Sequence, residues 1–353
     1  MEVNCEGCAG CCMDWRGLLE DEAGASHGTA DGDSDGVATK RHRRRRDPFG
    51  SDREAKPSRE PLDDDPSFVA LTRDEVRAFL EAGMGDALMP RFWHAREEGE
   101  GARSSGSSSG DAPRTGEGVD IDGHSVAAVA GRPAFFVGLR KPPKPVAPFG
   151  REEPTWLPTC VFLDPTTLQC RLHGDDLYPD ECGAYPEYNL ALAHETECER
   201  VERAFGGDRL LEDSYGDTDG LLLGSQAIGA KLFCHPRPAD LEGLADRAVA
   251  GDLRREDRAE TVAVAAASSP GTLAISEPHY ERAKARLLAG ETGTGNDTDE
   301  SATADGGSWV GQAIRDWQRR CREAGETVPA PTVADAVEVA RGAPETPGWD
   351  ALE

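Results

Sequence analysis

Hydrophobic periodicity predicts helices over much of the chain, most strongly in its carboxyl-terminal part. Residues 72–75 (Thr-Arg-Asp-Glu) have the form of a capping box and precede apolar residues at helical spacing, which predicts a helix over 73–82. A second helical segment is expected over 85–97. Beyond residue 210, helical spacing recurs in the segments 219–232, 239–250, 255–267, 277–289, 308–324 and 332–341.

Fewer segments have β character. The run 133–139 (Pro-Ala-Phe-Phe-Val-Gly-Leu) predicts a strand or one arm of a hairpin, and a Pro-rich loop is expected over 141–158. Short apolar segments then flank an Asp-Pro-Thr-Thr turn, which predicts a small β-hairpin with Cys160 and Cys170 on its two arms. The expected fold is therefore mainly α with a small β-hairpin: an irregular, metal-stabilised cysteine-cluster domain followed by a helical carboxyl-terminal region.

Polar, low-complexity segments divide the chain. Residues 20–66 and 99–118 are rich in small and charged residues and predict disordered insertions, and 291–307 predicts a linker. A length of 353 residues allows one large domain or two ordinary ones. We expect a cysteine-cluster metal-binding domain over 1–205 and a helical region over 206–353.

The net charge limits the classes of partner. The chain carries a formal charge of -27 and has few lysines relative to arginines, a composition typical of halophilic proteins. In about 1 M salt the Debye length falls to roughly 3 Å, which screens the self-repulsion. A nucleic-acid binder needs a net basic face, so none is expected as a partner. The basic run 40–46 is interpreted either as a binding patch or as a solvated linker that contacts acidic surface.

Cellular location affects how the cysteines are interpreted. No apolar segment precedes Cys5, and the longest apolar stretch, near 261–268, is too short to cross a bilayer. We expect a cytoplasmic protein without membrane contact. Clustered thiols in a reducing compartment more often bind metal than form disulfides.

The first cysteine block is the densest chemical signal in the chain. It has the sequence Cys5-Glu-Gly-Cys8-Ala-Gly-Cys11-Cys12. Thiols two residues apart can converge on one metal ion when a glycine-containing turn brings them together. Adjacent Cys11 and Cys12 project in different directions in most backbone conformations, so one of them is expected to serve a second site or to be a spare redox-active thiol.

The second block supplies four more candidate ligands. The full candidate set is Cys5, Cys8, Cys11, Cys12, Cys160, Cys170, Cys182 and Cys198. Soft thiolates select zinc, iron–sulfur clusters or Cu(I), and four are needed for a zinc site or a four-iron cluster. The first block is similar to the start of a bacterial ferredoxin motif but lacks its final Cys-Pro. The spacing thus predicts a thiolate metal site and leaves the metal open between an iron–sulfur cluster and zinc.

The order of these motifs resembles the YkgJ-type cysteine-cluster family. The shared elements are Cys-x-x-Cys-x-x-Cys-Cys, Cys-Val-Phe-Leu-Asp with Cys-Arg-Leu-His, Tyr-Pro-x-x-Cys-Gly-Ala-Tyr-Pro and a later cysteine. That family is described as zinc- or iron-chelating and is often labelled an iron–sulfur oxidoreductase. The resemblance implies the same eight cysteines as ligands. The family's arginines around the third late cysteine are replaced here by Tyr178-Pro179 and Gly183.

Three functions follow as expectations. The first is a cysteine-cluster metalloprotein that transfers electrons to a protein redox partner, with an iron–sulfur oxidoreductase as the enzyme class. The second is a protein-lysine N-methylase-like enzyme, because relatives of flagellin lysine-N-methylase share the cysteine pattern. The third is a zinc-stabilised interaction scaffold. Cys234 and Cys321 are interpreted as structural, and the pattern assigns no catalytic residue.

Overall fold

The computed structural model describes residues 2–19, 60–65, 67–95, 118–191, 195–212, 227–269, 271–289, 308–325 and 327–351. The basic run 40–46, the linker 291–307 and nearly all of the two predicted insertions lie outside these residues. Residues 60–65, from the end of the first predicted insertion, are described and lie against a strand, where Leu62 N donates to the carbonyl of Phe92 at 2.9 Å.

The strand β5 (Arg132–Leu139) is the centre of a four-stranded antiparallel sheet. It pairs along its length with β1 (Leu88–Phe92), β4 (Ala128–Val129) and β8 (Phe233–Cys234). Its aromatic and β-branched residues, Phe135, Phe136 and Val137, suit a pleated surface that is buried on both sides. The predicted strand at 133–139 is therefore confirmed.

Two further antiparallel pairs flank this sheet. β2 (Val119–Ile121) and β3 (His124–Val126) are joined by Asp122 and Gly123, both with positive φ (55° and 81°). This is the backbone of a type I′ turn, which Asp-Gly favours. β6 (Pro143–Val146) pairs with β7 (Thr155–Pro158), so the Pro-rich loop predicted over 141–158 is instead a two-stranded sheet.

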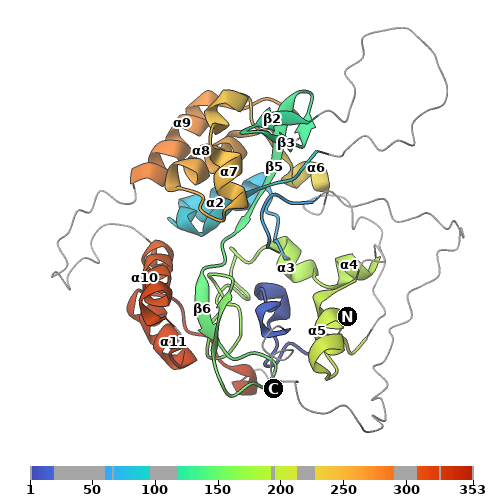
Figure 1. Ribbon diagram of the computed structural model, residues 1–353, viewed down its shortest axis with the longest axis vertical. Helices are drawn as coiled ribbons and strands as arrows, with labels where there is room; N and C mark the ends of the chain where they lie inside the picture. Colours follow the sequence, from blue (N-terminus) through green and yellow to red (C-terminus); the bar gives the residue numbers. More distant parts are fainter. Residues whose placement is uncertain are drawn as a thin grey trace, which may run out of the picture.

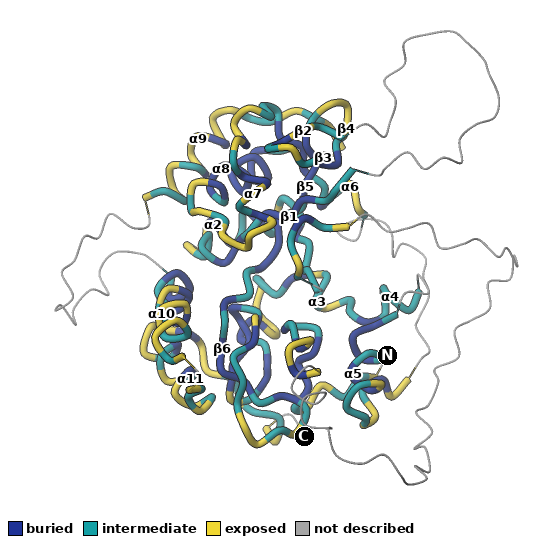
Figure 2. Tube along the Cα trace, viewed as in Figure 1, coloured by how far each residue is buried: buried dark blue, intermediate teal, exposed yellow. Residues whose placement is uncertain are grey.

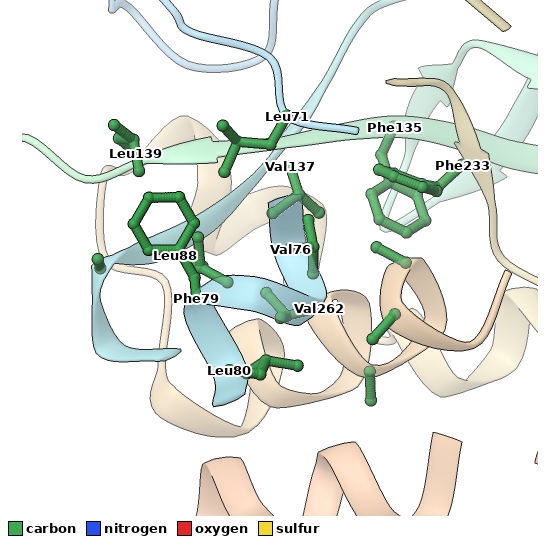
Figure 3. Close-up of a cluster of buried hydrophobic side chains, with 14 of the residues drawn as sticks. Leu71, Val76, Phe79, Leu80, Leu88, Phe135, Val137, Leu139, Phe233 and Val262 are labelled. Carbon is green, nitrogen blue, oxygen red and sulfur yellow. The ribbon is translucent and has the colours of Figure 1, made fainter. Parts of the chain in front are cut away.

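The helices cover the sheet and enclose the main hydrophobic core. α2 (Arg73–Glu81) begins at a capping box in which Thr72 and Glu75 bond each other's backbone amide, as predicted. α8 (Arg255–Ala267) is buried along most of its length between α2, the sheet and α9 (Glu277–Ala289). Figure 3 shows Val76 and Phe79 of α2 beneath Val137 and Leu139 of β5, with Val262 of α8 close to Val76. The remaining elements are η1 (Gly10–Cys12), η2 (Gly85–Ala87), α3 (Asp180–Ala184), α4 (Glu187–Ala191), α5 (Glu197–Phe205), α6 (Ile228–Lys231), η4 (Pro238–Leu241), α7 (Leu244–Val249), α10 (Trp309–Ala324), α11 (Pro331–Ala340) and η5 (Trp349–Ala351).

The described residues form two halves joined by the chain that runs from β5 into β6 (Figure 1). The sheet half contains the four-stranded sheet, α2 and α7–α9. The cysteine half contains the amino-terminal segment, β6, α3–α5, α10 and α11. Both halves include elements from either side of residue 206, and the division into 1–205 and 206–353 stays a prediction. Dark blue stretches in Figure 2 show that buried backbone runs through both halves.

The predicted fold class is wrong. The described residues form a mixed α and β fold with three antiparallel sheets, whereas a mainly α fold with one hairpin was expected. The segment 85–97 contains η2 and β1 in place of the expected helix, because Pro90 opposes helix formation and the segment finds a partner in β5. The idea of an irregular, metal-stabilised domain also fails, since one extensive apolar core includes Phe135 of the sheet half together with Phe162 and Trp317 of the cysteine half.

Candidate metal centre

The amino-terminal cysteine block lies against the middle of the chain through backbone hydrogen bonds. Asp14 N donates to the carbonyl of Pro158 at 2.8 Å, and Cys160 N donates to that of Cys12 at 2.7 Å. An antiparallel bridge joins Met13 to Thr159 between these bonds. Cys12 and Cys160, separated by 148 positions in the sequence numbering, are thus neighbours in space.

Cys170 returns to the same place through a tight turn. The carboxylate of Asp164 accepts hydrogen bonds from the amides of Thr166 (2.8 Å) and Thr167 (3.2 Å), as expected of an Asp that begins a turn. The chain closes with a bridge between Leu163 and Cys170. The predicted hairpin is therefore reduced to a turn and a single bridge, but it does bring Cys170 back toward Cys160.

Cys182 is placed by the contacts of α3 with the sheet half. The preceding residue, Glu181, accepts from the amide of Ala70 at 3.0 Å and from Lys231 Nζ at 2.9 Å. The amide of Asp180 donates to Glu75 Oε1 at 2.9 Å. These bonds fix the first turn of α3 against α2 and α6.

Cys198 is placed by α5, which begins at a second capping box formed by Thr196 and Glu199. The helix lies close against η1, and Gly10 allows this approach. A Cβ atom at Gly10 would lie 2.7 Å from Val201 Cγ2 and 3.7 Å from Cys8 Sγ. Figure 1 shows the amino-terminal segment between α5 on one side and β6 on the other.

Five of the eight predicted cysteines line one cavity of about 260 Å³: Cys11, Cys12, Cys160, Cys170 and Cys182. Its other walls come from both halves of the molecule. Phe68, Val69 and Leu139 are contributed by the sheet half, and Tyr178 and Tyr185 by the segment around α3. The thiols therefore face a cavity at the junction of the two halves that has both apolar and charged residues in its walls.

Burial keeps most of these thiols protonated near neutral pH. It raises the pKa of Cys170 to about 12, with a further contribution from Cys160. Burial also raises the pKa of Cys182. A metal ion that binds here has to displace these protons, as thiolate ligation requires.

Cys11 and Cys12 form a close pair with their Sγ atoms 3.8 Å apart. The hydrogen bond between the two thiols lowers the pKa of Cys11 and raises the pKa of Cys12. The expectation that the two side chains point apart is wrong. Neighbouring residues have Cα atoms about 3.8 Å apart. This is below the usual range of roughly 4.4–6.8 Å between the Cα atoms of a disulfide, so the geometry favours two free thiols over a disulfide between Cys11 and Cys12.

Several charged side chains at the cavity were missed at the sequence level. Lys141 Nζ is bound by Asp65 Oδ1 (2.7 Å) and Ser67 Oγ (2.6 Å). Glu197 accepts from Trp15 Nε1 at 3.2 Å and pairs with Arg200. No spacing rule connects these residues with the cysteines, because they meet only in the folded chain.

The donor chemistry of the cavity fits a thiophilic metal, since three separate segments each contribute thiols to it. Within the described residues, however, no three or more His, Cys, Asp or Glu side chains already have the positions of metal ligands. Binding would thus require the thiols to move together. Cys234 lies in β8 and Cys321 in α10, apart from this set. The role of the eight cysteines as ligands stays a prediction.

The chain belongs to a family of unknown function, DUF7531, whose profile matches residues 1–350. Comparison with curated proteins and with solved structures gives no match. Across the part of the chain that the structure describes, every helix falls short of the length or the apolar character needed to cross a membrane.

Proposed function

We propose that this member of the DUF7531 family is a cysteine-cluster metalloprotein that binds an iron–sulfur cluster or zinc through thiolates. The observation that carries the proposal is the convergence of Cys11, Cys12, Cys160, Cys170 and Cys182 on one cavity. Thiolate donors from distant segments that meet in one cavity suit a soft metal better than a hard cation. The resemblance to the YkgJ-type family supports the same assignment.

The protein's own residues would hold the metal and shield it from water. Tyr178, Tyr185 and Phe68 line the cavity beside the thiols, and such apolar surroundings lower the local dielectric constant and tune a bound centre. An iron–sulfur cluster would supply one-electron transfer, and zinc in a closed site of four thiolates would be structural. We place the protein in the cytoplasm, with a protein redox partner if the metal is iron.

Purification without oxygen, in molar salt, tests the proposal. Elemental analysis and absorbance near 400 nm separate the two metals: iron with sulfide and a brown colour indicates a cluster, and colourless protein with zinc indicates a structural site. A full chain that contains no metal and takes up none after reduction would contradict the proposal. Binding of S-adenosylmethionine would instead favour the lysine-methylase alternative, which requires that cofactor.

A further inference from the structure

We propose that the eight cysteines form two adjacent four-thiolate centres, one at the cavity and one between η1 and α5. The cavity centre comprises Cys12, Cys160, Cys170 and Cys182. The second centre, called here the helix centre, comprises Cys5, Cys8, Cys11 and Cys198. This division rests on the proposed function and specifies how many metal centres the chain holds and which thiols share each of them.

The cavity centre is carried by the backbone around Cys160. Cys160 N donates to the carbonyl of Cys12, and the Leu163–Cys170 bridge closes the turn that follows. Cys182 faces the same cavity from α3. Three separate segments thus present four thiols to one space.

The helix centre is carried by the packing of η1 on α5. Cys8 lies in a second hydrophobic cluster with Trp15 and Val201, and Val201 is three residues after Cys198 on α5. The close approach at Gly10 places Cys8 Sγ beside this helix. Cys5 is tied to Cys8 by a turn in which Cys8 N donates to its carbonyl at 3.1 Å.

Cys11 lies at the boundary between the two centres. It lines the cavity, and its Sγ atom lies 3.8 Å from that of Cys12. It also belongs to η1, which packs against α5.

Cys11 is assigned to the helix centre because the cavity already offers four other thiols. The remaining three, Cys5, Cys8 and Cys198, need one more to complete a tetrahedral site. Because Cys11 and Cys12 are adjacent in the sequence, the two centres would lie side by side, with a ligand of one in van der Waals contact with a ligand of the other. Loss of one centre is expected to leave the other with its full set of thiols.

Metal stoichiometry of single cysteine variants tests this division. The Cys8→Ser and Cys160→Ser variants of the full chain are each expected to retain about half of the wild-type metal, and the double variant to retain almost none. Cys321→Ser is the matched control, because Cys321 lies in α10, and it is expected to retain all of the metal. Cys198→Ser and Cys182→Ser provide a second pair if either first variant does not fold.

A titration of the reduced, metal-free wild-type protein with Co²⁺ gives an independent count. Two equivalents with thiolate charge-transfer absorption are expected. One equivalent, or the loss of all metal in either single variant, would overturn the two-centre assignment while leaving metal binding itself intact. No binding by the wild-type chain would instead refute the proposed function.

Discussion

Glu338 and Lys144 form an ion pair in which Oε1 and Nζ lie 2.5 Å apart, with neither side chain exposed to solvent. Lys144 Nζ also donates to the carbonyls of Val161 (2.8 Å) and Leu163 (2.7 Å), between Cys160 and Cys170. Because Glu338 lies on α11, this pair connects the carboxyl-terminal helices with the turn that carries two of the candidate ligands. The helices at the end of the chain thus support the thiol site.

Replacing Glu338 by Ala is expected to destabilise the protein strongly. The charge of Lys144 would remain buried without its carboxylate partner, and such changes cost about 3–5 kcal/mol. Trp317 Nε1 would also lose its acceptor, which it contacts at 3.1 Å. Urea unfolding in molar salt measures the loss in the free energy of unfolding.

A matched surface substitution separates this effect from a general loss of charge. Glu323 pairs with Arg319 at 3.3 Å, but its side chain is 63% exposed. Glu323→Ala is expected to change stability by less than about 1 kcal/mol. Equal effects of the Glu338 and Glu323 substitutions would contradict the proposed role of the buried pair.

Gly10→Ala tests the contact between η1 and α5. The added methyl group would meet Val201 Cγ2 at 2.7 Å, so either the helix or the turn has to shift. Overpacking of this kind costs about 1–3 kcal/mol, and displacement of Cys8 is expected to lower metal content as well. Thermal unfolding and elemental analysis provide the two measurements.

Gly229→Ala is the control for this substitution. Gly229 lies in α6, and an added Cβ meets no atom within 4 Å there. The substitution is expected to be neutral or stabilising by up to about 1 kcal/mol, because Ala favours a helix over Gly. If Gly10→Ala were equally harmless in both measurements, η1 would not be fixed on α5 as described.

A buried polar network in the sheet half predicts how stability depends on pH. Burial alone would raise the pKa of Glu260, but hydrogen bonds from His235, Lys284 and Tyr280 outweigh it and lower the pKa to about 2. A carboxyl group whose pKa is lower in the folded state stabilises the fold above its unfolded pKa, about 4.3. That contribution is lost as the pH falls from about 4.3 toward 2.

The Glu260→Gln variant isolates this contribution from those of the other carboxylates. Its stability is expected to fall less steeply than that of the wild type between pH 4.5 and about 2, because Gln does not titrate. Chemical unfolding at several pH values provides the comparison. Parallel curves for the two proteins would show that Glu260 does not contribute through its ionisation.

Local signals predicted several elements well. The capping box at Thr72 and Glu75 is formed by neighbouring residues, and α2 begins where it was expected. Periodicity also predicted α8, α9, α10 and α11 to within a residue or so. These helices present one apolar face or are buried throughout, and the necessary information lies within each segment.

The strands were harder to predict because their partners are distant in the sequence. β1 has a strand conformation only through its pairing with β5. β6 pairs with β7 although the two strands together contain three prolines, Pro143, Pro145 and Pro158. Asp122-Gly123 was a usable hairpin signal that was not recognised. At the candidate site, the cysteines were predicted from residue type, but Lys141 and Glu197 meet them only through folding.

Alkylation of the thiols with and without a chelator tests the central claim most directly. In anaerobically purified full-length protein, mass spectrometry would report which cysteines react. We predict that chelation increases labelling at the eight cysteines of the two blocks and leaves Cys234 and Cys321 unchanged. Labelling of the eight that does not depend on the chelator would contradict a metal-binding role for the array.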